Sequence, residues 1–307
     1  MSTLPDEVRA ACAEVAASGR RVRIEEEAVP AYAARLPVPG PPQPDPRLEL
    51  PGAGREARAA FWTCLDAINF GSGWWPTIRK RRGHSGFFTV AAGLADRFRV
   101  RGPWSAAELK NMRREEIAAS LGQDPGHPLM ADFAAALRDV GCHVLAEHGA
   151  SFAAAVDSGG GSAPALAGMF ASWDAFADVS TYDGLRVPFY KRAQLLAADL
   201  DRSGVAALRG LDRLTAFADN LVPHVLRLDG ILALAPELAA RIEAGELLVH
   251  DSPEEVELRA VAVHAVELLA GERPDLTPAQ IDAELWRRGG GRRYKDRPRP
   301  RCRNSAY

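Results

Sequence analysis

The sequence predicts an all-α fold, built as a single multi-helix globular domain. Apolar residues recur at three- and four-residue steps in around ten segments, and prolines, capping residues and glycines mark many of the segment ends. Alternating segments that would pair convincingly as strands are not found. With 307 residues, the chain is long enough for one large domain or two small ones.

Residues 1–36 are expected to form an N-terminal helical hairpin. Residues 5–19 place apolar side chains on one helix face, and residues 21–24 alternate in a way that could form a strand. Residues 25–35 return to a helical pattern, with Pro30 as a bend or boundary. Because so short a segment rarely builds its own core, it should dock on the rest of the chain as a lid or a brace.

Residues 37–53 are predicted to be an extended linker. Seven prolines stand between Pro37 and Pro51, and proline neither continues a helix nor donates to a sheet. The main helical domain is expected to occupy residues 54–307. Its helices are predicted at residues 54–70, 105–121, 127–148, 163–176, from 188 onward, 236–244, from 252 onward and 277–286.

Several of these boundaries have specific signals. Ser105 and Glu108 form a capping box, and Gly149 is the glycine expected just after a helix end. Pro188 suits the first turn of a helix, where its missing N–H is not needed. The segment 287–307 is strongly basic, and its composition alone is typical of a disordered tail.

Two charged residues stand out. Lys191 lies beside the apolar face of its helix, where a lysine can pack its stem and extend its ammonium group to water. Asp219 precedes Pro223, which cannot donate to the carbonyl of residue 219, so the backbone there should open or begin a new helix. A carboxylate at a helix start is stabilised as the anion. The simplest interpretation of Asp219 is therefore a helix cap.

Two adjacent tryptophans, Trp74 and Trp75, follow the Gly71-Ser72-Gly73 break. They could be partly buried loop aromatics, or one of them could stack against a flat base. Side chains of adjacent residues in an extended segment point in opposite directions, so at most one of the two faces a given pocket.

Composition argues against several functional classes. A net charge of −2 gives no general attraction to nucleic acid or anionic lipid, and no apolar run approaches membrane-spanning length. The four cysteines lack CxxC spacing and the seven histidines are dispersed, so neither a disulfide frame, a metal site nor a Ser-His-Asp triad is supported. The basic cluster at residues 79–82 is typical of a solvated loop. The first residues lack the apolar core of a secretory signal, so a cytoplasmic protein is expected.

Several short segments, in this order along the chain, resemble the queuosine salvage protein family. They are Asp66-x-x-Asn69-Phe70, Ser85-Gly86-Phe87-Phe88, Phe189-Tyr190-Lys191-Arg192-Ala193-Gln194, Phe217-Ala218-Asp219, Glu255-Val256-Glu257-Leu258-Arg259, and the final Arg301, Cys302 and Tyr307. Together they span most of the chain from about residue 54. The insertion Gly71-Ser72-Gly73 departs from the family pattern, which leaves open whether Trp74 or Trp75 takes the aromatic position.

The resemblance implies a fold like that of the helical, helix-hairpin-helix type DNA glycosylases. It also implies hydrolysis of the N-glycosidic bond of queuosine 5′-phosphate to queuine and ribose 5-phosphate, without a cofactor or a metal. Asp219 and Lys191 would be catalytic, and the basic tail would pack on the body. The substrate-binding residues implied are Asp66 and Asn69 at the polar edge of the base, Phe70, Phe87 and one of Trp74 and Trp75 at its faces, and Arg192, Arg259 or Arg301 at the phosphate. For Arg259 and Glu257, a salt bridge inside the helical body is an equal alternative.

Two other functions compete with the hydrolase. A base-excision glycosylase acting on DNA or RNA would need a broad basic face and usually a glycine-rich hairpin that grips the phosphate backbone. The segment after Lys191 offers only residues 201–204 for such a hairpin. A non-catalytic queuine- or nucleoside-binding protein would keep the aromatic residues and tolerate the loss of Asp219. The hydrolase is the favoured prediction, with the small nucleotide as its partner and neither nucleic acid nor membrane expected.

Overall fold

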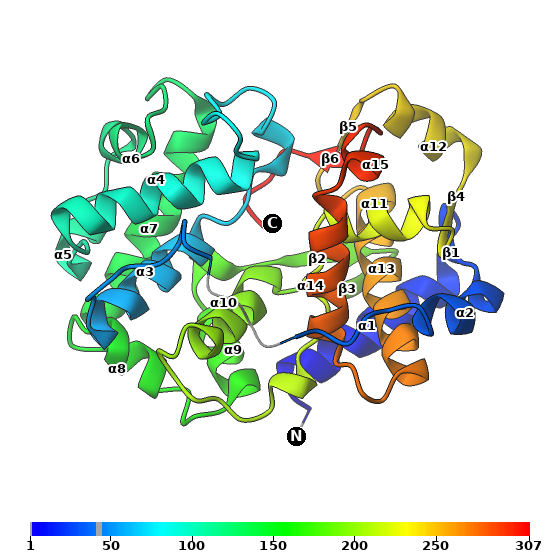
Figure 1. Ribbon diagram of the computed structural model, residues 1–307, viewed down its shortest axis with the longest axis horizontal. Helices are drawn as coiled ribbons and strands as arrows, with labels where there is room; N and C mark the ends of the chain where they lie inside the picture. Colours follow the sequence, from blue (N-terminus) through cyan, green and yellow to red (C-terminus); the bar gives the residue numbers. More distant parts are fainter. Residues whose placement is uncertain (1, 41–44) are drawn as a thin grey trace.

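The computed structural model describes residues 2–40 and 45–307, and most of these residues are helical, as predicted. Two hydrophobic cores divide the helices into two lobes (Figure 1). The first lobe contains α3 (Arg55–Ala67), α4 (Gly86–Arg101), α5 (Ala106–Lys110), α6 (Arg114–Leu121), α7 (Pro128–Glu147), α8 (Phe152–Asp157), α9 (Ala163–Ala171) and α10 (Lys191–Arg202). The second lobe contains α1 (Leu4–Ser18), α2 (Val29–Ala33), α11 (Leu221–Leu228), α12 (Pro236–Glu243), α13 (Pro253–Glu272), α14 (Pro278–Gly289) and α15 (Arg292–Lys295).

In the first lobe, α7 is the helix around which its neighbours pack. It starts at Pro128, directly after its cap residue His127, and Gly149 follows its last turn in the left-handed region (φ 58°), as predicted. An added Cβ at Gly141 would lie 2.3 Å from the backbone nitrogen of Lys110, so only glycine lets α5 approach α7 this closely. The predicted helix over 105–121 is two helices, α5 and α6, with a break at residues 111–113.

In the second lobe, α13 lies against α1 and α2. It begins after Ser252, whose Oγ accepts from the N–H of Glu255, at the predicted cap. The strand β1 (Val22–Ile24) pairs antiparallel with β4 (Leu232–Leu234), which joins the N-terminal segment to the body. The predicted strand over 21–24 is therefore confirmed.

The expectation that no strands pair is wrong. Besides β1 and β4, the strands β2 (Val179–Tyr182) and β3 (Leu185–Pro188) form an antiparallel hairpin, and β5 (Leu247–Leu248) pairs parallel with β6 (Arg301–Cys302). Asp183 and Gly184 form the hairpin turn with φ 47° and 85°, the positive values that a two-residue type I′ turn requires. These strands are two to four residues long, too short to produce a clear alternating pattern in the sequence.

The hairpin also corrects the predicted start of the helix that carries Lys191. Pro188 is the last residue of β3 and lies opposite Val179, so it is not in a helical turn. The backbone N–H groups of Phe189 and Tyr190 donate to the carbonyl of Asp178, and Tyr190 adopts a left-handed φ of 49°. As a result, α10 begins at Lys191.

Other elements differ from the sequence prediction in smaller ways. α4 was not predicted; it begins after Ser85, whose Oγ accepts from the N–H of Phe88. The predicted helix over 163–176 ends at Ala171, and a 3₁₀ turn, Asp174–Phe176, follows it. Of the predicted linker 37–53, residues 41–44 lie outside the described residues, and the others form neither helix nor strand. Within the described residues, no helix is long and apolar enough to span a membrane.

The tail segment, which we define as residues 299–307, is packed into the molecule. Figure 1 shows the end of the chain lying between the two lobes. Cys302, Ala306 and Tyr307 are buried, and an added Cβ at Gly73 would lie 2.4 Å from the carbonyl oxygen of Cys302. The packing expected from the family resemblance is confirmed, and the disorder that composition alone suggests is not observed.

Candidate active site

Lys191 is the first residue of α10 and is only 6% exposed. Its Nζ donates a hydrogen bond to the carbonyl of Asn69 at 3.0 Å. The interpretation that its ammonium group extends into water is therefore wrong. Burial lowers the pKa of Lys191, and the charges of Asp219 and Asp66 act in the opposite direction.

Asp219 lies at the start of α11, where the sequence predicted that a helix could begin. Its Oδ1 accepts from the backbone N–H groups of Leu221 at 2.7 Å and Val222 at 3.0 Å. The carboxylate is thus a helix cap, held in place by two donors. It remains half-buried and lines a cavity, so capping does not remove it from contact with a ligand.

The segment before Asp219 is fixed by two buried charged residues. Asp282, on α14, accepts from the N–H of Phe217 at 3.0 Å. Arg259, on α13, donates to the carbonyl of Ala218 through Nη2 at 3.1 Å. Both contacts are made to backbone atoms of residues 217 and 218. They therefore fix the path of the chain just before Asp219, independently of the side chains of these two residues.

Three further carboxyl groups lie near Lys191 in the interior. Asp66 is fully buried on α3, and its Oδ1 accepts from the Nδ2 of Asn69 at 3.3 Å. Burial raises the pKa of Asp66 well above its usual value, and the neighbouring Asp199 raises it further. Burial likewise raises the pKa of Asp282, followed by the charge of Asp219. The structure therefore brings the predicted residues Lys191, Asp219, Asp66 and Asn69 together around one amine.

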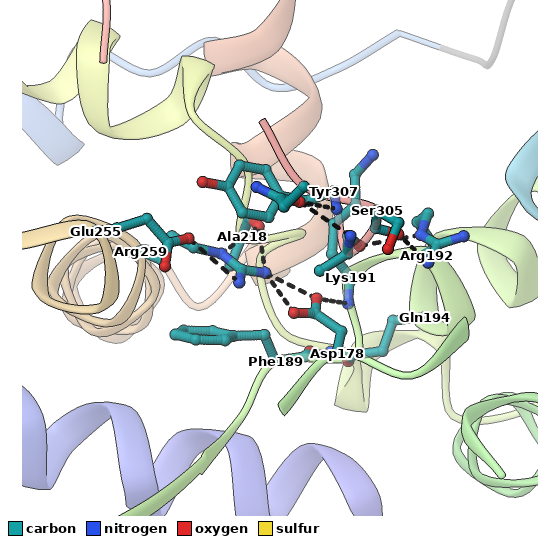
Figure 2. Close-up of polar contacts among 12 residues, drawn as sticks. Asp178, Phe189, Lys191, Arg192, Gln194, Ala218, Glu255, Arg259, Ser305 and Tyr307 are labelled. Atoms are coloured by element: carbon teal, nitrogen blue, oxygen red, sulfur yellow. Dashed lines mark hydrogen bonds and ion pairs between the residues drawn. The ribbon is translucent and has the colours of Figure 1, made fainter. Parts of the chain in front are cut away.

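Asp178 and Arg259 form a buried ion pair beneath this group (Figure 2). The Nη2 of Arg259 is 2.7 Å from Oδ2 of Asp178, which also accepts from the backbone N–H of Lys191 at 3.1 Å. The guanidinium carbon of Arg259 lies 3.9 Å from the ring centroid of Phe189 and 4.0 Å from that of Tyr307. Arg259 is thus enclosed between two rings and forms the salt bridge inside the helical body that the sequence left as an alternative.

Arg192 makes a second set of contacts that hold the tail segment. Its guanidinium group donates to the carbonyls of Ser305 at 2.6 Å and Ala306 at 2.9 Å, and to the carbonyl of Ala67 at 2.5 Å. Only 2% of Arg192 is exposed. All three nitrogens of the Arg192 guanidinium group therefore bond to backbone carbonyls, whereas the Nη1 of Arg259 has no hydrogen-bond partner among the described residues and lies 3.7 Å from Glu255.

The predicted aromatic residues occupy three different environments. Phe70 is buried in the first core, with its ring centroid 5.0 Å from that of Phe133. Trp75 covers Gly86, where an added Cβ would lie 2.3 Å from the indole ring. Phe87 lies 5.8 Å from the ring of Trp286, on α14, so it connects the first lobe to the second.

The cavity beside Asp219 is very small, with a volume of about 10 Å³. Its lining includes Asn220, Arg259, Arg301 and Tyr307. Ligand pockets are usually about 300–1,000 Å³, so a nucleotide at Asp219 would require neighbouring side chains to move apart.

Trp74, in the 3₁₀ turn Ser72–Trp74, is half-buried, and its ring lies 6.0 Å from the guanidinium carbon of Arg303 in the tail segment.

Comparison with known proteins places this arrangement in a family. Residues 50–305 match the family described as queuosine salvage protein. The chain belongs to this family. A protein of Sphaerobacter thermophilus, named queuosine 5′-phosphate N-glycosylase/hydrolase, is 38% identical over 250 residues, which cover 77% of each chain. Proteins with the same name from Dictyostelium discoideum and Mus musculus are each 29% identical; the matches cover 76% and 59% of this chain and 73% and 55% of theirs.

Within the region that matches the queuosine salvage family, sequence analysis missed two residues of the site. Asp282 had a signal, because it stands beside Ile281 and one turn before Leu285 on the buried face of α14, and an acid on an apolar face is seldom buried without a partner. Asp178 had none, because it lies in the loop before β2 and its partner Arg259 is 81 residues away in the sequence.

Proposed function

We propose that this chain hydrolyses the N-glycosidic bond of queuosine 5′-phosphate and releases queuine for reuse in tRNA modification. The observation that carries the proposal is the proximity of a half-buried carboxylate, Asp219, which lines a cavity, to a buried amine, Lys191. Membership of the queuosine salvage family and the names of the relatives supply the substrate.

Asp219 has the principal role in the proposed reaction. Water adds to C1′ of the ribose as the bond to the base nitrogen breaks, and the proton from the water ends on the departing base. Queuine is a 7-deazaguanine, so it offers no N7 to protonate. Much of the rate must therefore come from stabilising the positive charge that develops on the sugar, which a fixed carboxylate does. The same carboxylate can orient and deprotonate the water.

Lys191 acts electrostatically in this proposal. Its ammonium group lies close enough to Asp219 for the two charges to interact, so it attracts the carboxylate and helps to position it. A Schiff base between Nζ and C1′ is the alternative role. Hydrolysis needs no covalent step, and borohydride should therefore trap no sugar on the protein.

The other predicted residues are assigned by their surroundings. Asp66 and Asn69, next to Lys191, are proposed to contact the polar edge of the base; the Oδ2 of Asp66 has no hydrogen-bond partner among the described residues. Trp74, Trp75 and Phe87 are proposed as the aromatic contacts, since they are half-buried. Three predicted residues are proposed to support the site without contacting the substrate: Phe70, Arg192 and Arg259. Phe70 packs in the first core, Arg192 donates to a backbone carbonyl of the tail segment, and Arg259 donates to the carboxylate of Asp178.

We propose that the substrate is a small nucleotide handled in the cytoplasm, and not a nucleic-acid chain. The four cysteines are free thiols, which fits a reducing compartment. The likeness to helical DNA glycosylases is proposed to extend to the placement of Lys191 and Asp219 from neighbouring segments. Salt-sensitive binding to duplex DNA would contradict this proposal.

The test compares wild type with Asp219→Asn for release of queuine from queuosine 5′-phosphate, measured by chromatography. Asparagine keeps an acceptor for Leu221 and Val222 but removes the charge, so turnover should fall about 10²–10⁴-fold while binding persists. Asp212→Asn, at an exposed aspartate in a nearby turn, is the matched control and should behave as wild type. Binding without turnover by the wild type would instead identify a queuine- or nucleoside-binding protein.

A further inference from the structure

The arginines that follow α14 fall into two groups. Arg293 and Arg297 pair with carboxylates at 3.2 Å, the first with Asp229 and the second with Glu243. Arg299 and Arg301 have no carboxylate oxygen within 4.0 Å in the part of the chain that the structure describes. Their lack of acidic partners needs an explanation, because both are half-buried.

The unpaired arginines lie beside the proposed catalytic carboxylate. Arg301 lines the cavity that contains Asp219. The residue between the two arginines, Pro300, accepts from the Nδ2 of Asn220 at 2.8 Å, and Asn220 directly follows Asp219. This contact fixes the tail segment against the start of α11. Residues two apart in an extended segment share one side, so Arg299 and Arg301 flank the same anchored proline.

The two arginines are also close enough for their charges to interact. Burial lowers the pKa of Arg299, followed by the charge of Arg301, while Asp219 acts in the opposite direction. Two cations of the tail segment therefore repel one another next to Asp219.

We propose that Arg299 and Arg301 bind the 5′-phosphate of the substrate. This inference rests on the proposed function. A guanidinium group can donate two parallel hydrogen bonds to a phosphate. A phosphate dianion at this position would neutralise the mutual repulsion of the two cations. The other candidates are already engaged: Arg192 directs its donors at three carbonyls, and Arg259 is paired with two buried carboxylates.

The first experiment measures kcat and KM for queuosine 5′-phosphate and for queuosine, with wild type, Arg299→Gln and Arg301→Gln. Each substitution should lower kcat/KM for the nucleotide about 10- to 100-fold, as expected for the loss of a hydrogen bond to a charged group. The loss for the nucleoside should be at least tenfold smaller, because the nucleoside has no phosphate to contact. Arg292→Gln, at a side chain that is 95% exposed in the same basic segment, is the matched control and should leave both substrates unaffected.

The second experiment needs no turnover. Inorganic phosphate and ribose 5-phosphate should raise the melting temperature of wild type and of Arg292→Gln, and should raise that of Arg299→Gln and Arg301→Gln much less. In the absence of ligand, the two variants should melt at or above the wild-type temperature, because removing one of two repelling cations relieves their repulsion. A residue that only stabilises the fold would give a lower melting temperature.

The outcomes separate this inference from the proposed function. If wild type cleaves nucleotide and nucleoside with equal kcat/KM, or if the variants lower both alike, the phosphate subsite is wrong and the hydrolase stands. If wild type cleaves neither substrate, the hydrolase is wrong, and the phosphate titration still decides whether these cations bind an anion. If phosphate raises the melting temperature equally in wild type, Arg292→Gln, Arg299→Gln and Arg301→Gln, the proposed phosphate subsite is wrong.

Discussion

At the scale of single residues, the site consists of the buried amine of Lys191 with several acidic side chains around it. Lys191 interacts with Asp66, Asp219 and Asp282, and these acids do not share equal surroundings. Asp66 and Asp282 are buried and their pKa values are raised, which favours their neutral forms. Asp219 instead is half-buried, and its carboxylate accepts two backbone N–H groups at a helix start. Unlike Asp66 and Asp282, it lines the cavity.

Asp282 is predicted to be a positioning residue. Asp282→Asn keeps an acceptor for the N–H of Phe217 and should retain turnover within about threefold of wild type, since the raised pKa of Asp282 favours the neutral form. Asp282→Leu leaves that buried donor unsatisfied and should lower kcat more than it changes KM, by releasing the segment that holds Asp219. Steady-state kinetics of the two variants check this prediction. Equal losses in both would mean that the charge of Asp282, and not its acceptor, matters.

The same residue has a pH signature. Its folded pKa is raised above the usual 3.8, so the unfolded chain loses this proton at a lower pH than the folded chain. Folding stability contributed by the neutral form is present below pH 3.8 and is lost as pH rises through the folded pKa. Urea unfolding across that range should show a less negative slope of stability against pH in Asp282→Asn than in wild type.

At the scale of elements, the geometry of the site depends on the hairpin before Lys191 and on the contacts of Asp178 and Asp282. The sequence predicted the catalytic candidates but not these supporting elements. The strands on either side of the turn at Asp183 and Gly184 are only four residues long and give no clear sequence pattern, so Pro188 was assigned to a helix that begins three residues later. Lys191 and Asp219 were identified through residue type and family resemblance. Their partners were not, because Asp178 and Asp282 act through contacts 13 to 81 residues away in the sequence.

The contact between the turn at Ser72–Trp74 and β6 gives a prediction at this scale. Gly73→Ala would place a methyl group 2.4 Å from the carbonyl oxygen of Cys302, so the tail segment must shift. We expect a loss of about 1–3 kcal/mol in the free energy of unfolding and a clear fall in turnover, because Arg301 and Tyr307 move with β6. Chemical denaturation and queuine release measure the two effects.

The matched control is Gly168→Ala, in the middle of α9. No atom lies within 4 Å of an added Cβ there, so alanine should stabilise the protein by about 0.5–1 kcal/mol through helix propensity and leave turnover unchanged. Wild-type turnover in Gly73→Ala would show that the position of the tail segment does not matter for catalysis.

At the scale of the whole molecule, the N-terminal segment completes the second core. Val8, Cys12 and Val15 of α1 are fully buried, and Glu257 of α13 accepts from the backbone N–H groups of Arg21 at 2.7 Å and Val22 at 3.0 Å. We propose that residues 1–36 are a brace and not a lid, with 37–53 as the linker to a main domain over 54–307. The segment covers apolar surface that the body cannot bury alone.

Deleting residues 1–36 should therefore prevent cooperative folding. The apolar sides of α13 and β4 would be exposed, and the deleted chain should bind a hydrophobic dye, aggregate, and give no sharp thermal transition. Glu257→Leu is the milder variant: it leaves two buried N–H donors unpaired and should destabilise the protein by about 3–5 kcal/mol. A deleted chain that melts at the wild-type temperature with only a changed KM would support the lid instead.

The burial of the tail segment has a consequence for how the protein is made. Arg192 bonds to Ser305 and Ala306, which are synthesised 113 and 114 residues after it. A nascent chain that has already formed α3, α10 and the hairpin before Lys191 still lacks both the partners of this arginine and the ring that covers Arg259. The first lobe can collapse early on the ribosome, but the pocket beside Asp219 stays incomplete until residues 299–307 have left the exit tunnel. Until then, incomplete chains remain without activity, with the acids around Lys191 open to water.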